Sequence, residues 1–225
     1  MELRFFEIYR SPEYLGLLAE GAAMSAGLTA LSGLLGFVCA LGLSLSRHAR
    51  IPVLRHVAAV YVEVVRNTPL IVQLFFVAFG LPMLLGYQWP FWAHAVLALT
   101  LNFSAYFAEI LRAGYQGVDK GQLEAAEALG VRRGVIFTRI VLPQAVARMF
   151  PSLGSQFIFL FLTTAVISEI GVRDLTNAGL FIDSRTFRSF EVFITLTILY
   201  IAISLAFKGL MAWAESRLFR WKEAR

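Results

Sequence analysis

Stretches without any charged residue constrain this chain more than any other feature of its sequence. Asp, Glu, Lys and Arg are absent from residues 21–46, 67–108 and 149–168. A helix that crosses a membrane needs about 20 largely apolar residues, because its peptide groups have no water to bond to and must bond to one another. The middle stretch is long enough for two such helices, with a Gly- and Pro-containing turn at residues 80–90. The sequence therefore predicts an all-α polytopic membrane protein.

The composition agrees with that class and limits the partners. The 225 residues are 58% apolar and 16% charged, whereas soluble domains carry about 25% charged residues. The net charge of +5 could indicate a nucleic acid partner, but basic loops at the cytoplasmic face of a membrane protein explain the excess more simply. We expect membrane lipid, and no nucleic acid, as a partner.

A metal centre is not expected. Cys39 is the only cysteine, so an intrachain disulfide is impossible and a cysteine-based metal site is disfavoured. The histidines His48, His56 and His94 lack the spacing of metal ligands. We interpret the first two as solvated loop residues and the third as an interfacial residue.

Five membrane-spanning helices are predicted within a single domain, residues 1–225. They lie at about residues 22–45, 57–80, 91–111, 151–170 and 190–213. Of the 20 Lys and Arg residues, 14 fall in the segments that follow the first, third and fifth spans, and five fall on the opposite side. Because basic loops stay in the cytoplasm, we expect the N-terminus outside and the C-terminus in the cytoplasm.

The longest loop, residues 112–150, faces the cytoplasm in this topology and contains helical patterns of its own. A helix-like run at residues 122–129 is closed by Gly130, which occupies the usual place of a helix stop. A second amphipathic run at residues 131–147 is interrupted by Pro143. By shape alone, the first run is a loop helix with a solvated face that carries Glu124 and Glu127.

The pattern inside this loop resembles the signature of bacterial ABC importer permeases. The matching residues are Glu124-Ala125-Ala126, then Gly130, then Ile140-Val141-Leu142-Pro143, against the family pattern E-A-A, G, I-x-L-P. The resemblance implies a cytoplasmic coupling helix that docks in a groove of a separate ATP-binding subunit. It further implies that Glu124 and Gly130 fix the docking geometry and that Leu123, Ala126 and Leu129 fill the groove.

Three further segments are similar to the permeases for glutamate, aspartate, glutamine, histidine and arginine, and this resemblance covers residues 20–215. The segments are Arg66–Phe75 (RNTPLIVQLF), Glu109–Gly114 (EILRAG) and Gly121-Gln122. The resemblance implies a bacterial inner-membrane location and a second permease subunit, identical or homologous. It also implies an extracytoplasmic amino-acid-binding protein, which would dock against residues 171–188 and the outer helix ends.

The chain lacks the G-x-x-x-x-G-K-[ST] phosphate loop. We therefore expect ATP and Mg to be bound by the partner ATPase subunit, and this chain to be neither an enzyme nor the holder of a cofactor. The expected function is that of a permease subunit of an ATP-driven importer for polar amino acids. The alternative is an ion-gradient-driven secondary transporter of small polar solutes, which would need neither a docking loop nor partners.

Four charged residues lie near the cytoplasmic ends of spans two and three: Glu63, Arg66, Glu109 and Arg112. Within each pair the residues are three positions apart and share one helical face. Because a charge inside a membrane is costly unless it has a partner, we interpret the four as an ionic network that holds the two spans together. A direct role in substrate binding is the alternative.

Uncharged polar residues lie nearer the middle of the membrane: Asn67, Thr68, Gln73, Asn102, Thr163 and Thr164. Pro69 interrupts the second span, and transporter sites often lie at such interruptions. We expect these residues to line the translocation pathway, with ordinary hydrogen bonding between helices as the alternative. Many relatives carry a lysine where this chain has Leu162. Either substrate recognition in this chain rests on neutral groups and the external binding protein, or a non-identical partner permease supplies the positive charge that Leu162 lacks.

Overall fold

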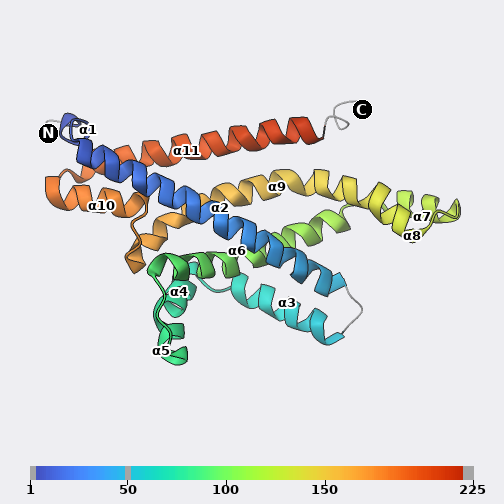
Figure 1. Ribbon diagram of the computed structural model, residues 1–225. Coiled ribbons are helices and arrows are strands. Elements are labelled where there is room, and N and C mark those ends of the chain that lie inside the picture. Colours follow the sequence, from blue (N-terminus) through green and yellow to red (C-terminus); the bar gives the residue numbers. More distant parts are fainter. Residues whose placement is uncertain (1–3, 49–51, 220–225) are drawn as a thin grey trace.

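The computed structural model describes residues 4–48 and 52–219, all of whose regular structure is helical (Figure 1). The α-helical elements are α1 (Phe6–Tyr9), α2 (Pro12–His48), α3 (Pro52–Arg66), α4 (Leu70–Phe75), α5 (Leu81–Leu85), α6 (Phe91–Gln116), α7 (Lys120–Ala128), α8 (Arg133–Val135), α9 (Leu142–Thr163), α10 (Leu175–Thr186) and α11 (Ser189–Leu218). Two π-helical segments, η1 (Phe76–Gly80) and η2 (Ile136–Val141), and one 3₁₀ segment, η3 (Thr164–Ile170), continue neighbouring helices.

The long helices form one elongated bundle in which the chain runs back and forth. Within the described residues, four helices are long and apolar enough to cross a membrane: residues 12–47, 91–116, 133–170 and 189–218. The helix α3 and the segment from α4 to α5 form a bent pair, which counts as a fifth candidate if its two parts are taken as one span; in Figure 1 its second part turns away from the line of α3. The all-α membrane architecture predicted from the charge-free stretches is therefore confirmed.

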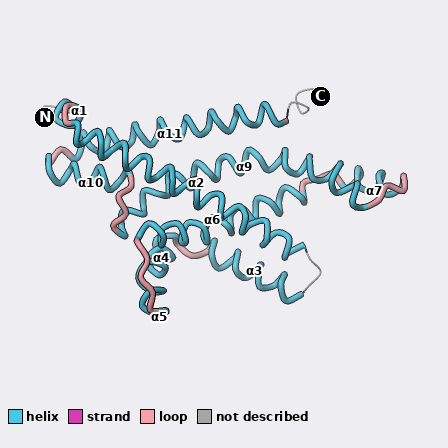
Figure 2. The backbone as a smooth tube through the Cα atoms, viewed as in Figure 1, coloured by secondary structure: helices cyan, strands magenta, loops and turns pink. Residues whose placement is uncertain are grey.

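The two ends of the bundle differ in what they contain. The short helix α1 and the helix α10 lie at one end, which we call the α1 end (Figure 1). The helix α7, the C-terminal end of α2, the start of α3 and the end of α11 lie at the other, the α7 end (Figure 2). Four of the 14 basic residues assigned to the cytoplasmic loops lie outside the described residues: Arg50, Arg220, Lys222 and Arg225.

The second predicted span is not one straight helix at residues 57–80. The helix α3 ends at Arg66, and the axis of the segment 70–85 is bent by 107° from that of α3. The cause is Pro69, which lacks an N–H donor and disfavours helical backbone in the residue before it. The expected turn after Gly80 is also displaced, because the helix continues to Leu85 and ends at Gly86, whose φ is +69°.

Two prolines are accommodated without ending a helix. Pro82 and Pro143 each follow a π-helical segment, residues 76–80 and 136–141 respectively. The wider turn of a π-helix shifts the hydrogen-bond register, as occurs at π-bulges within α-helices. The predicted interruption at Pro143 is therefore wrong: residues 133–170 form one candidate span of 38 residues.

Other boundaries differ from the predicted spans by more than a turn. The first helix begins at Pro12 rather than near residue 22, and the third continues to Gln116. Residues 171–188, expected to be a loop, contain α10. Asp174 begins that helix, because its side chain accepts the backbone N–H of Asn177 at 2.8 Å.

The main core surrounds α6, which packs chiefly against α2 and α9. Phe103 and Phe107 of α6 are fully buried, and the ring of Phe107 lies 5.0 Å from that of Phe157 in α9. A second apolar cluster at the α1 end joins α1, α2, α10 and α11 through the buried residues Ile8, Leu18, Leu175, Ala178, Ile182, Val192 and Leu196. These two clusters hold the long helices and α10 in place.

Candidate coupling segment and translocation pathway

The helix α7 projects at the α7 end and has well-defined ends. Asp119 accepts the backbone N–H of Gly121 at 2.8 Å and so caps its first turn. At the other end Gly130 has a φ of +70°, and its N–H donates to the carbonyl of Glu127 at 2.9 Å. A left-handed residue that ends a helix is favoured as glycine because any side chain there is strained.

The exposed face of α7 differs in part from the face that the resemblance implied. Glu124, Ala125 and Leu129 are exposed, and the Leu129 side chain is 82% accessible. Ala126, expected to fill a partner's groove, is only 6% accessible, and Leu123 on the same face is half-buried. The chain itself covers this face, because α7 packs against η2. The expectation for Ala126 is therefore wrong, since a residue buried in its own chain offers no surface to a partner.

A side-chain contact links α7 to the long helix that follows it. The amide of Gln144 donates to the amide oxygen of Gln122 at 2.7 Å and to the carbonyl of Ile140 at 3.1 Å. Gln144 lies near the start of α9, within the continuous helix of residues 133–170. A displacement of α7 would therefore be transmitted directly to the fourth span.

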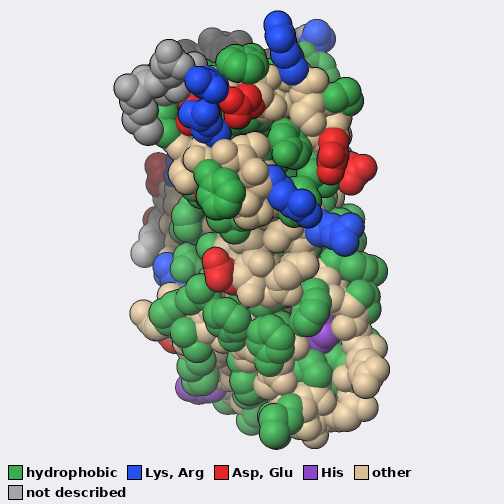
Figure 3. Space-filling model, turned by 90° about the vertical axis from the view of Figure 1, so that its left-hand side faces the viewer, with side chains coloured by type: hydrophobic (Ala, Val, Ile, Leu, Met, Phe, Trp, Pro, Cys, Tyr) green, Lys and Arg blue, Asp and Glu red, His purple; other side chains and the backbone are tan. Residues whose placement is uncertain are grey.

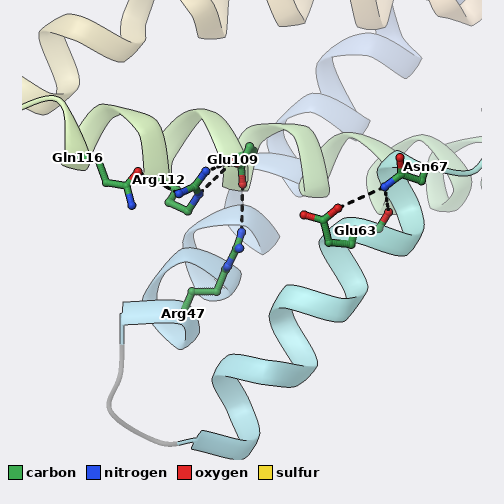
Figure 4. A network of polar contacts seen from close by, with 6 residues as sticks. All are labelled: Arg47, Glu63, Asn67, Glu109, Arg112 and Gln116. Atoms are coloured by element: carbon green, nitrogen blue, oxygen red, sulfur yellow. Dashed lines mark hydrogen bonds and ion pairs between the residues drawn. The ribbon is translucent and has the colours of Figure 1, made fainter.

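Glu109 is the centre of the charged cluster near the α7 end (Figure 4). One of its carboxylate oxygens accepts from Arg47 Nη1 at 3.1 Å, and the other accepts from Nε of Arg112 at 2.9 Å and from its Nη2. Arg112 also donates to the amide oxygen of Gln116 at 2.9 Å. Because Arg47 ends the first span and Glu109 belongs to the third, this cluster joins spans one and three.

The other charged pair makes separate contacts. Glu63 accepts from the amide of Asn67 at 3.3 Å within the same span (Figure 4). The guanidinium of Arg66 lies 5.5 Å from the ring centroid of Tyr106 in α6, a cation–π contact. The second and third spans are thus joined here through the aromatic ring of Tyr106. The charged cluster around Glu109 also contains Arg47, which the sequence did not indicate.

The side chain of Gln73 bonds to backbone carbonyls at the break in the second span. Its amide donates to the carbonyl of Val65 at 2.7 Å and to that of Thr68 at 3.1 Å. Carbonyls at the end of a helix lack partners within it, so this side chain satisfies groups that the break releases. The amide oxygen of Gln73 accepts in turn from buried Asn102 at 3.1 Å, which connects the bend to α6.

The four remaining polar residues bond to their own helices. The amide of Asn67 and the hydroxyls of Thr68, Thr163 and Thr164 donate to carbonyls three or four residues earlier. Thr164 is fully buried, whereas Asn67 is exposed and Thr68 and Thr163 are half-exposed. Of the residues predicted to line a pathway, Asn67, Thr68 and Thr163 are therefore accessible at the surface. The side chains of Gln73, Asn102 and Thr164 are instead bonded within the chain.

A groove on α11, largely apolar in its lining, was missed in the sequence. It has a volume of about 580 Å³ and is lined by Leu162, Thr176, Phe193, Leu196, Thr197, Tyr200, Ile201, Ser204 and Leu205. Thr197, Tyr200 and Ser204 are three and then four positions apart, which places their hydroxyls on one helical face. That spacing was visible in the sequence. Leu162 lies at the wall of this groove.

His94 is buried within the chain. Its side chain is 2% accessible, and neither ring nitrogen has a hydrogen-bond partner within the described part of the chain. The ring lies among those of Tyr87, Trp89 and Phe91, at centroid distances of 5.7–6.3 Å. The ring therefore does not face solvent, because the turn at residues 86–90 folds its aromatic side chains over the start of α6; its expected position at the membrane interface stays a prediction.

Comparison with known proteins agrees with this architecture. The chain is 40% identical over 195 residues to the L-cystine transport system permease protein TcyL of Bacillus subtilis, with coverage of 84% of this chain and 81% of the relative. It is 37% identical to the arginine transport system permease protein ArtQ of the same species, over 84% of this chain and 86% of the relative. It is 36% identical to the glutamine transport system permease protein GlnP of Escherichia coli, over 90% and 93%.

Solved structures show the same fold. A crystal structure of an amino acid ABC transporter with histidines has 37% sequence identity and a TM-score of 0.89, covering 96% of this chain and all of that chain. The relatives are permeases, which are transport subunits and not enzymes, and the likeness does not favour a secondary transporter. Residues 32–220 match the family described as the binding-protein-dependent transport system inner membrane component. The chain belongs to this family of inner-membrane permease subunits.

Proposed function

We propose that the chain is one of two permease subunits of an ATP-driven importer of polar amino acids. The observation that carries this proposal is the likeness over nearly the whole chain to permeases whose names specify cystine, arginine and glutamine transport. The second permease subunit is identical or homologous. Import requires an extracytoplasmic amino-acid-binding protein, which delivers the substrate.

In the proposed orientation the α1 end faces outward and the α7 end faces the cytoplasm. The segments at the α7 end contain 14 Lys and Arg residues against five Asp and Glu residues. The segments at the α1 end, residues 1–21, 81–90 and 169–191, contain five basic and eight acidic residues. This asymmetry follows the rule that basic loops remain in the cytoplasm, so the N-terminus lies outside and the C-terminus inside.

The helix α7 is the proposed coupling helix. Glu124, Ala125 and Leu129 form the face that contacts the ATP-binding subunit, and Gly130 sets the turn behind them. ATP and Mg are bound by that subunit. Closure of its nucleotide site moves α7, and the contact between Gln122 and Gln144 passes the movement to the long helix of residues 133–170.

The substrate passes beside the broken second span. Asn67 and Thr68 lie at the bend and remain accessible, and Thr163 lies near the end of α9. A passage of this chemistry binds an amino acid through neutral hydrogen-bonding groups, and the binding protein supplies most of the selectivity.

Reconstitution tests the proposal directly. The permease would be purified with the ATP-binding subunit, placed in proteoliposomes and supplied with the cognate binding protein. Uptake of labelled glutamine, arginine or cystine should require both ATP and the binding protein and should persist when an ionophore collapses the ion gradients. Uptake by this chain alone, driven by an ion gradient, would refute the proposal.

A further inference from the structure

A cavity at the α1 end contains a buried carboxylate that has no counter-charge. The cavity has a volume of about 400 Å³ and lies between α2 and α10. Its lining residues are Leu17, Glu20, Gly21, Met24, Arg173, Asp174, Asn177, Ala178 and Phe181. Four of these carry polar side chains: Glu20, Arg173, Asp174 and Asn177.

Asp174 is the residue that makes this cavity unusual. Its side chain is fully buried. One carboxylate oxygen accepts the N–H of Asn177 at 2.8 Å, whereas the other, Oδ2, is buried with no hydrogen-bond partner within the described residues. A carboxylate buried without a partner is costly, and burial accordingly raises the pKa of Asp174 to about 6.

The residues around Asp174 do not neutralise it. Arg173 and Glu20 are both exposed at the cavity, and within the described residues neither forms an ion pair. By contrast, Glu7 and Glu191 nearby are paired with Arg188 at 3.5 and 3.9 Å. The cavity therefore has two unpaired carboxylates and one cation at its surface.

The framework behind the cavity is closely packed. A side chain at Gly21 would approach the backbone oxygen of Asp174 to 2.7 Å, so α2 lies directly against the start of α10. Ser25 accepts the N–H of Leu175 at 3.2 Å, and Thr176 is hydrogen-bonded to Tyr200 of α11 at 2.8 Å. Asp174 is thus held in place by three helices, which suits a preformed binding site.

The surface around the cavity indicates the charge of the partner. Figure 3 views the molecule from the α1 end, and charged side chains gather over the upper part of this face while hydrophobic ones cover the lower part. Within the described residues, the segments 4–21 and 169–191 at this end carry a net charge of −2, from five basic and seven acidic residues, although the whole chain carries +5. A surface of this sign attracts and orients a basic partner surface.

We propose that the cavity receives a lysine or arginine side chain of the docked extracytoplasmic binding protein, which pairs with Asp174 and Glu20. The inference rests on the proposed function, because it requires the α1 end to face the binding protein. The entering cation supplies the partner that Oδ2 of Asp174 lacks, and Glu20 at the rim guides its approach. Docking therefore converts an unpaired buried carboxylate into an ion pair.

Binding measurements on the whole transporter test this proposal. The permease with its ATP-binding subunit would be placed in nanodiscs of phosphatidylglycerol, a lipid without an amine, and titrated with the cognate binding protein. Asp174→Asn should weaken binding about tenfold or more, because it leaves a buried cation unpaired, and Glu20→Gln at the rim about threefold. Glu13→Gln is the matched control, since Glu13 is exposed on the same helix outside the cavity, and should leave the affinity unchanged.

Further controls distinguish misfolding of a variant, failure of the cavity proposal and failure of the proposed function. Asp174→Asn keeps a side chain that can cap α10, and Glu20→Gln alters only an exposed residue, so at least one variant folds. Replacing each Lys and Arg of the binding protein by Gln should identify one position whose effect is not additive with Asp174→Asn. If both cavity variants bind like the parent, or weaken binding no more than Glu13→Gln, the proposal is overturned while the proposed function stands. Absence of binding by the parent would overturn both.

Discussion

The contact between Arg47 and Glu109 allows a quantitative test of how spans one and three are held together. At 4 Å, two unit charges attract by about 4 kcal/mol at an effective dielectric constant of 20. The side chains of Arg47 and Glu109 are 20% and 23% accessible, and Arg47 Nη1 lies 3.1 Å from the carboxylate. Solvent screening and the ordering of two side chains offset part of this attraction, and we expect a net coupling of about 1–2 kcal/mol.

A double-mutant cycle measures that coupling. Arg47→Gln, Glu109→Gln and the double variant would be unfolded by denaturant in detergent micelles, with tryptophan fluorescence as the signal. The single changes should together lower the free energy of unfolding by about 1–2 kcal/mol more than the double change does. Glu13→Gln is a suitable control, because Glu13 is exposed near the opposite end of α2 from Arg47, and should show no coupling to Arg47. A coupling below about 0.3 kcal/mol, within the usual additivity error, would refute the reasoning.

Three further predictions concern single positions. Gly130→Val should destabilise the turn by about 1–3 kcal/mol, because a β-branched residue is strained at a φ of +70°. It should therefore abolish the stimulation of ATPase activity by the binding protein, which an ATPase assay of the assembled transporter measures. Gln73→Leu should lower the free energy of unfolding by about 2–3 kcal/mol, since it leaves buried Asn102 and two carbonyls unsatisfied. The pKa of Asp174 is about 6 in the folded chain, against an ordinary value of 3.8. Because the folded value is the higher one, protonation of Asp174 stabilises the folded state. This stabilisation is complete below pH 4 and is lost as the pH rises through 6. At about 1.4 kcal/mol per tenfold change in proton affinity, the whole loss is about 3 kcal/mol, of which about 1.4 kcal/mol falls between pH 5 and pH 8. Thermal unfolding at these two pH values should show that part in the parent but not in Asp174→Asn.

The positions of the long helices could be predicted because a membrane leaves few alternatives. Charge-free stretches of sufficient length must become helices, and the end of α7 at Gly130 follows from the need for a left-handed residue. The sequence also identified Pro69 as an interruption. It did not give the 107° bend, because the direction of a break depends on what packs against it, here Gln73 and Asn102.

The remaining differences arise from tertiary contacts or from signals that were overlooked. The pairing of Arg47 with Glu109 joins residues 62 positions apart, and no local pattern indicates it. The burial of Ala126 depends on the packing of α7 against η2. By contrast, Asp174 followed by a helical run is a recognisable helix start, and the hydroxyls of α11 have a helical spacing. Both were present in the sequence.

The central claim is that α7 contacts an ATP-binding subunit, and site-specific cross-linking tests it most directly. Cys39 would first be replaced by Ala, because this native thiol is exposed, and Leu129→Cys would then be labelled with a photoactivatable thiol reagent in the purified complex. Met83→Cys is the control, since Met83 is 89% accessible and lies on α5, away from α7 (Figure 1). We predict that illumination joins Leu129→Cys, and not Met83→Cys, to the ATP-binding subunit. The absence of that adduct, or an equal yield from both positions, would contradict the account.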